Sequence, residues 1–134
     1  MLNDKEYRYF NILKNYILRR LNIKVDIYPL DHKLFIPMEE DEEVLGCCHK
    51  IRSESGDLKG YLITIDEPYI RACYYGRQTA YSPYSDNQLI ETICHEIAHL
   101  YVWDHNEDHK NLTNELYDFI ISSIEKNKSF NKKY

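Results

Sequence analysis

The sequence predicts a single α+β domain with an N-terminal helix, a small and mostly antiparallel sheet, and two helices at the end of the chain. Apolar residues recur at helical spacing near both ends, and they alternate with polar residues in the middle. The length of 134 residues suits one compact core. We expect one domain over 1–134, with a helix at 1–22, the sheet at 23–76, helices at 85–102 and 107–125, and a basic tail at 126–134.

The predicted sheet begins with a half-buried strand. Apolar and polar residues alternate from Ile23 to Ile27, and the strand is expected to end at Pro29. The segments VLGCCHKIRS and KGYLITID are expected to form an antiparallel hairpin that turns near Ser55–Asp57. A further strand, YIRACYY, is expected to end at Gly76.

The two C-terminal helices have a start signal and an apolar face. Ser85 is expected to be the N-cap of the first, because Gln88 follows three residues later as in a capping box. In the second helix Leu112, Leu116 and Ile120 recur on one face. Both helices are therefore expected to pack on the core.

Composition points to a soluble, intracellular protein. The chain starts without an apolar run of signal-peptide type, and no stretch approaches the ~18 apolar residues of a membrane span. The net charge of −5 does not favour a nucleic-acid surface. We expect a monomer without a membrane partner. The cysteines are expected to be free thiols rather than disulfides: Cys47, Cys48, Cys73 and Cys94.

A metal-binding motif lies in the predicted helix at 85–102. His95, Glu96 and His99 form the pattern H-E-x-x-H. Four helical residues advance by about 400°, so both imidazoles project from one face and can reach one zinc ion at about 2.0–2.1 Å. Glu96 lies about 100° around the helix, where it can hold a water molecule. The alternative is a pair of surface histidines, with an apolar stripe nearly opposite them made of Ile90, Ile93, Cys94, Ile97 and Tyr101.

A catalytic zinc ion usually has three protein ligands and an open position. His105 follows the first histidine by ten residues, and the turn-forming residues 103–106 can return its imidazole to the helix. His109 is another candidate, although it falls on the core-facing side of the last helix, and Glu115 would suit a two-histidine, one-glutamate site. We predict zinc on the two histidines of the motif and His105.

The stretch HEIAHLYVWDHNEDHKNLTNEL resembles the active-site segment of SprT-like and WLM-type zinc metallopeptidases, which belong to the HExxH clan of zincins. Their pattern is similar to H-E-L-A-H, five residues and a third histidine followed by an acidic turn. His95, Glu96, His99 and His105 match it residue by residue. The resemblance covers about residues 44–121 and implies a minimal zincin-like domain.

The resemblance implies a zinc-dependent peptidase in which Glu96 is the general base, acting on proteins or peptides, with DNA-bound proteins among the candidates. The alternative is a zinc-binding zincin-fold module with a regulatory or DNA-associated binding role and little proteolysis. Ile63 and Ile65 lie on a strand that is expected either to form a sheet edge pairing with an extended substrate or to belong to the core.

Overall fold

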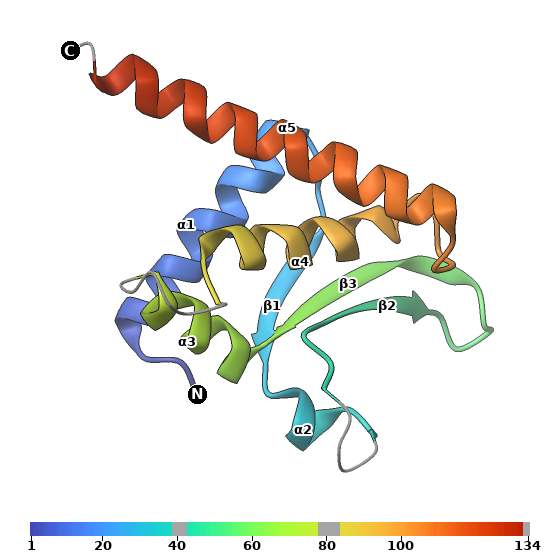
Figure 1. Cartoon of the computed structure of the whole chain (residues 1–134). Helices are drawn as coiled ribbons and strands as arrows, with labels where there is room; N and C mark the ends of the chain where they lie inside the picture. Colours follow the sequence, from blue (N-terminus) through green and yellow to red (C-terminus); the bar gives the residue numbers. More distant parts are fainter. Residues whose placement is uncertain (39–42, 78–83, 133–134) are drawn as a thin grey trace.

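The computed structural model describes residues 1–38, 43–77 and 84–132, and it confirms the α+β class (Figure 1). In chain order the elements are α1 (Asp4–Leu21), β1 (Asp26–Leu30), α2 (His32–Phe35), β2 (Gly46–Arg52), β3 (Leu58–Asp66), α3 (Glu67–Gly76), α4 (Asp86–Ala98) and α5 (Glu107–Lys132). None of the helices in these described ranges combines the length and the apolar character needed to cross a bilayer.

The three-stranded sheet has the order β1-β3-β2, so β3 is its central strand. β2 pairs with β3 in the antiparallel sense, but β1 pairs with β3 in the parallel sense. The sheet is therefore mixed, and the expected antiparallel pairing holds between β2 and β3 but not between β1 and β3. Pro29 lies inside β1 rather than at its end. An edge strand tolerates proline because one side of its backbone has no partner strand.

The β2–β3 hairpin turns where the sequence predicts it. The amide of Ser53 donates to the carbonyl of Asp57 at 2.8 Å, and the amide of Gly56 donates to the carbonyl of Ser53 at 2.9 Å. Gly56 has φ +89°, a left-handed conformation that glycine adopts without a steric penalty. The turn therefore sets the register between β2, which precedes it, and β3, which follows it.

The segment YIRACYY forms helix α3 and not the expected strand. Asp66 precedes the helix in an extended conformation, and Pro68 lies in the first turn, where a missing amide hydrogen costs little. Aromatic and β-branched residues favour strands, but burial here follows the helical period. The buried residues of α3 are Tyr69, Ile70, Cys73 and Gly76.

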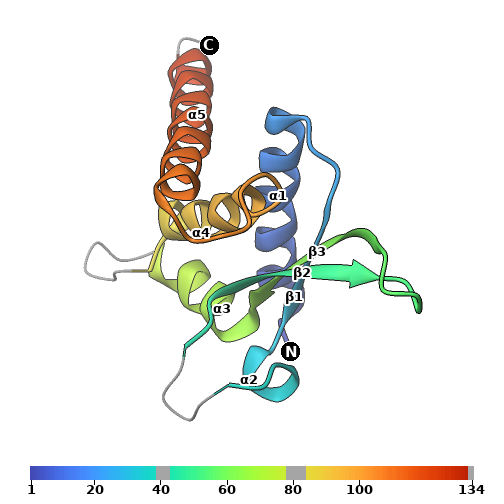
Figure 2. The ribbon, with the colours of Figure 1, turned by 90° about the vertical axis from the view of Figure 1, so that its right-hand side faces the viewer.

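Helix α4 lies between the sheet and α5, as Figures 1 and 2 both show. The hydroxyl of Ser85 accepts from the amide of Gln88 at 3.4 Å, which confirms Ser85 as the N-cap. Most of the predicted apolar stripe of α4 is fully buried, but Tyr101 is 65% exposed. The core combines α4 with side chains of α1, β3 and α3, including Phe10, Ile17, Ile63, Ile65, Ile70, Leu89, Ile93 and Ile97.

Both C-terminal helices differ in length from the prediction. α4 ends at Ala98, not near 102, because the amides of Leu100 and Tyr101 donate to carbonyls three residues earlier and tighten the last turn. α5 continues to Lys132, so residues 126–132 are helical and not a tail. Residues 133–134 of the expected tail lie outside the described residues.

Candidate metal centre

The end of α4 presents the two histidines of the motif: His95 lies in its last turn and His99 is its C-cap residue. His99 is only 7% exposed, so the alternative of two surface histidines is wrong for this residue. The ring Nδ1 of His99 lies 2.7 Å from the carbonyl oxygen of Trp103. A carbonyl can only accept, so Nδ1 carries the hydrogen, and a neutral His99 ring keeps its lone pair on Nε2. Nε2 is therefore the ring atom that His99 can offer to a metal ion.

His105 returns to α4 as the sequence predicts. Its Nε2 lies 3.2 Å from Nε2 of His95 and 3.0 Å from Nε2 of His99. Three nitrogens that share one tetrahedral zinc ion at about 2.0–2.1 Å stand roughly 3.3 Å apart. Two neutral imidazoles can form at most one hydrogen bond between their Nε2 atoms. One metal cation, by contrast, can bind the Nε2 lone pairs of all three histidines. The residues therefore fit a zinc ion in both chemistry and spacing.

A fourth histidine, His109 of α5, packs behind this group. A ligand atom of His109 lies within 4.8 Å of ligand atoms of His95 and His99, so these three residues could also hold a metal ion. The Nε2 of His109 lies 3.0 Å from the backbone carbonyl oxygen of His95 and therefore donates to it. Its ring stacks on that of His99, with centroids 4.1 Å apart and an interplanar angle of 26°.

The remaining candidate, Glu115, is exposed on α5. It is not among the described residues that line the hollows around the histidines. His109 is 3% exposed, so its expected core-facing position is confirmed. No sequence signal indicated that the His109 ring would lie against those of both His95 and His99.

Glu96 is 5% exposed, and its Oε2 lies 4.0 Å from Nε2 of His95. Burial raises the pKa of Glu96 to about 8. The pKa of His95 falls to about 4, first because of burial and then because of the neighbouring rings of His109, His99 and His105. His95 is therefore neutral near pH 7, which is the form that binds a metal.

Gly46, at the start of β2, is a site residue that the sequence reading missed. A Cβ at this position would lie 2.8 Å from Oε2 and 2.9 Å from Cγ of Glu96. Only glycine lets the strand approach the carboxylate so closely. A glycine within a strand pattern signals such an approach, and this signal was present in VLGCC.

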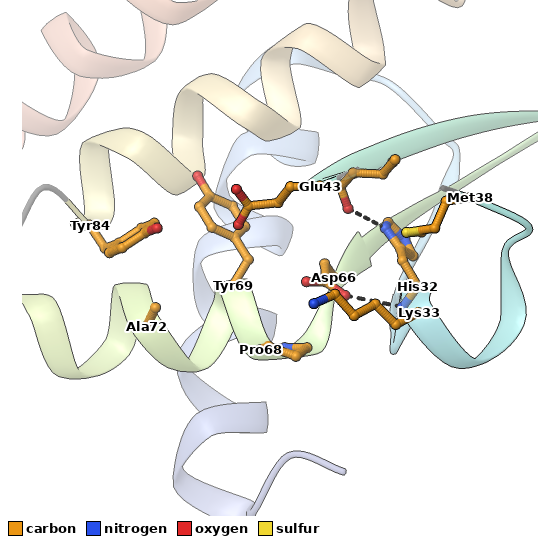
Figure 3. Close-up of a pocket in the computed structure, with 10 residues that line it drawn as sticks. His32, Lys33, Met38, Glu43, Asp66, Pro68, Tyr69, Ala72 and Tyr84 are labelled. Carbon is orange, nitrogen blue, oxygen red and sulfur yellow. Dashed lines mark hydrogen bonds between the residues drawn. The ribbon is translucent and has the colours of Figure 1, made fainter. Parts of the chain in front are cut away.

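Three adjoining hollows follow residues 43–48. The first, of about 290 Å³, lies between the start of β2 and the three proposed ligands. Its lining residues are Gly46, Cys47, Cys48, His95, Glu96, His99, Trp103, Asp104 and His105. The second, of about 280 Å³, shares Gly46, His95 and Glu96 with the first. The third, of about 470 Å³, shares Glu43 and Val44 with the second. Figure 3 shows this third hollow between His32 and Tyr84, and its lining does not include His95, His99 or His105.

The strand assigned to substrate binding is not a sheet edge. β3 has a partner on both sides, and Ile63 and Ile65 are completely buried. Neither side chain can contact a substrate, so both assignments are wrong and the core alternative is correct. Among the described residues β2 pairs with β3 alone, and its residues Gly46, Cys47 and Cys48 line the hollow that contains the histidines.

All four cysteines are free thiols, as expected. Burial raises the pKa of Cys48 to about 12 and raises that of Cys47, so neither thiol is activated in the metal-free protein.

Comparisons with protein-family models, with curated proteins and with solved structures find no match to this chain.

Proposed function

We propose that this protein is a zinc-dependent metallopeptidase whose metal is held by His95, His99 and His105. One observation carries the proposal. The Nε2 atom of His105 lies 3.2 Å from that of His95 and 3.0 Å from that of His99, although His105 comes after the end of α4. The H-E-x-x-H spacing accounts for two ligands, and the turn after α4 supplies the third.

His105 suits the third position better than His109. The Nε2 of His109 already donates to the His95 carbonyl, and its ring presents a face to His99. A metal-binding histidine must instead direct an in-plane nitrogen lone pair at the ion. We therefore assign His109 to the layer behind the ligands, where hydrogen bonds and packing orient them.

A bound zinc ion would supply a Lewis acid that activates water and polarises a carbonyl oxygen. Glu96 would take a proton from the attacking water and deliver it to the leaving amine. Glu96 can take that proton only in its ionised, carboxylate form. Positive charge at the three imidazoles would lower the pKa of Glu96 from about 8 and favour that form. The contact with Gly46 fixes where the carboxylate lies.

The free side of β2 is the best place for a substrate. An extended peptide there would use backbone groups that lack a partner strand among the described residues, and the adjoining hollows would take its side chains. Unfolded or locally extended proteins are thus the expected substrates, with DNA-bound proteins included by the resemblance to SprT-like and WLM-type peptidases. The free thiols suit a reducing, intracellular compartment.

Cleavage of a denatured protein by the zinc-loaded protein tests the proposal. We expect cleavage that a chelator abolishes, that zinc restores and that Glu96→Gln eliminates while zinc remains bound. Zinc binding without cleavage of denatured or DNA-bound protein would favour a binding module. Cleavage that persists in the Gln variant would exclude the assigned mechanism.

A further inference from the structure

The segment between α4 and α5 carries His105, but little of it is buried. Asp104 and His105 are exposed, and Tyr101 is 65% exposed. Its backbone hydrogen bonds reach only the end of α4, the start of α5 or a near neighbour, such as the bond from the amide of Asn106 to the carbonyl of Asp104 at 3.0 Å. Something else must hold this segment where His105 meets His95 and His99.

Trp103 makes the contacts that hold the segment on the sheet. The Lys50 ammonium lies 4.1 Å from the centre of the Trp103 ring, a cation–π contact. The Tyr61 ring centroid lies 6.0 Å from that of Trp103. Lys50 and Tyr61 are direct cross-strand partners on β2 and β3. The indole therefore rests on a pair whose relative position the sheet already fixes.

The backbone of Trp103 contacts the metal centre at the same time. Its carbonyl accepts from Nδ1 of His99 at 2.7 Å, which sets the tautomer and the orientation of that ring. The two rings are also close, with centroids 5.8 Å apart. His105 follows only two residues later. Any displacement of Trp103 would thus disturb His99 through this hydrogen bond and His105 through the connecting backbone.

We propose that Trp103 is a positioning residue that sets the metal affinity of the site by holding the His105 segment on Lys50 and Tyr61. The inference rests on the proposed metal centre but not on any cleavage activity. It assigns an effect on metal binding to Lys50 and Tyr61, neither of which belongs to the proposed ligand set.

Zinc affinity, measured in competition with a chromophoric chelator, tests this role. Trp103→Ala is expected to weaken binding about 10–100-fold, the usual effect of losing a group that orients a ligand. Trp103→Phe should restore most of the affinity because a phenyl ring keeps the contact with Lys50. Lys50→Met should weaken binding less, and adding it to Trp103→Ala should have almost no further effect. Tyr101→Ala, in the same segment, is the matched control and should bind as wild type does.

A second readout uses the fluorescence of the wild-type protein. The chain contains one tryptophan, so tryptophan emission that is excited beyond the absorption band of the tyrosines comes from Trp103 alone. Added Co²⁺, a quencher that replaces zinc, should reduce this emission and saturate at one equivalent. Lys50→Met should shift the titration to higher Co²⁺ while leaving the unfolding midpoint of the metal-free protein unchanged.

The outcomes separate the two proposals. Wild-type affinity in both Trp103→Ala and Lys50→Met would overturn the positioning role and leave the metal centre intact. Failure of the wild-type protein to bind zinc or Co²⁺ would overturn both. If Trp103→Ala does not fold, Lys50→Met decides the question alone: weaker binding supports the positioning role, and wild-type affinity overturns it.

Discussion

Gly46 and Glu96 approach so closely that a Cβ on Gly46 would collide with the Glu96 side chain, and this approach places the carboxylate against the start of the edge strand β2. A methyl group on Gly46 would lie within 3 Å of both Oε2 and Cγ of Glu96. The surroundings of Glu96 are closely packed, since the residue is 5% exposed. The position of the proposed general base is thus determined by a residue that has no side chain of its own.

Gly46→Ala should therefore impair catalysis more than metal binding. The methyl group would push the Glu96 side chain aside, and a displacement near 1 Å can cost about 100-fold in rate. We expect the cleavage rate to fall by about 10–100-fold while the protein still binds one zinc ion. Gly60→Ala is the matched control, because nothing lies within 4 Å of the added Cβ. Equal rates for Gly46→Ala and wild type would refute the role of this contact.

Glu96→Gln should stabilise the metal-free protein while abolishing activity. Burial raises the pKa of Glu96 from 4.5 to about 8, so the folded state binds the proton more tightly than the unfolded state. Below pH 4.5 Glu96 is protonated in both states and its burial costs no charge. As the pH rises from 4.5 through about 8, the unfolded state loses this proton first, so the free energy of unfolding falls. Glutamine does not ionise, so we expect a gain of about 3 kcal/mol at pH 7 and almost none at pH 4. Urea unfolding of chelator-treated proteins at both pH values measures the difference, and an equal gain at both would contradict the burial effect.

Substitutions at His105 and His109 should have different effects on metal binding. His105→Ala removes a proposed ligand and should lower zinc affinity by more than about 100-fold. His109→Phe keeps a ring next to His99 but removes the hydrogen bond to the His95 carbonyl, so we expect a loss of about 10-fold. The Co²⁺ absorption spectrum should change only for His105→Ala. The reverse order would identify His109 as the third ligand.

Thr64→Val should destabilise the fold without affecting the site. The Val44 carbonyl can only accept, so Nδ1 of His32 donates to it at 2.6 Å, and Nε2 of His32 accepts from the Thr64 hydroxyl at 2.9 Å. The Thr64 oxygen lies 2.9 Å from Nε2 of His49, which must then donate to it. Valine leaves the buried His32 nitrogen without a donor, a loss of about 1–3 kcal/mol. Thr64→Ser should keep the hydrogen bonds and most of the stability in chemical unfolding.

The local patterns that predicted the site were those in which chemistry and helical geometry coincide. The spacing of His95 and His99 places both imidazoles on one face of a helix, with Glu96 beside them. Helix α4 and its N-cap follow the sequence signals. The return of His105 was inferred from turn-forming residues and is seen in the short distances between nitrogens. His109 lies beside them because α5 packs against α4, which is tertiary information that a spacing along one helix does not contain.

The errors arose where distant segments decide the outcome. The aromatic and β-branched residues of YIRACYY suit a strand or a buried helix, and α3 forms because its apolar face packs on the core. Pairing of β1 with β3 depends on a strand more than 30 residues away, so its parallel direction left no local signal. The same pairing places β3 at the centre of the sheet and removes Ile63 and Ile65 from any substrate.

The most direct test is an anomalous-scattering map of zinc-loaded crystals, recorded on both sides of the zinc absorption edge. The proposal predicts one strong peak at about 2.0–2.1 Å from each Nε2 of His95, His99 and His105, with Glu96 outside the ligand set. The absence of a peak among these histidines, or a peak bound by His109 with His105 turned away, would contradict the proposed centre.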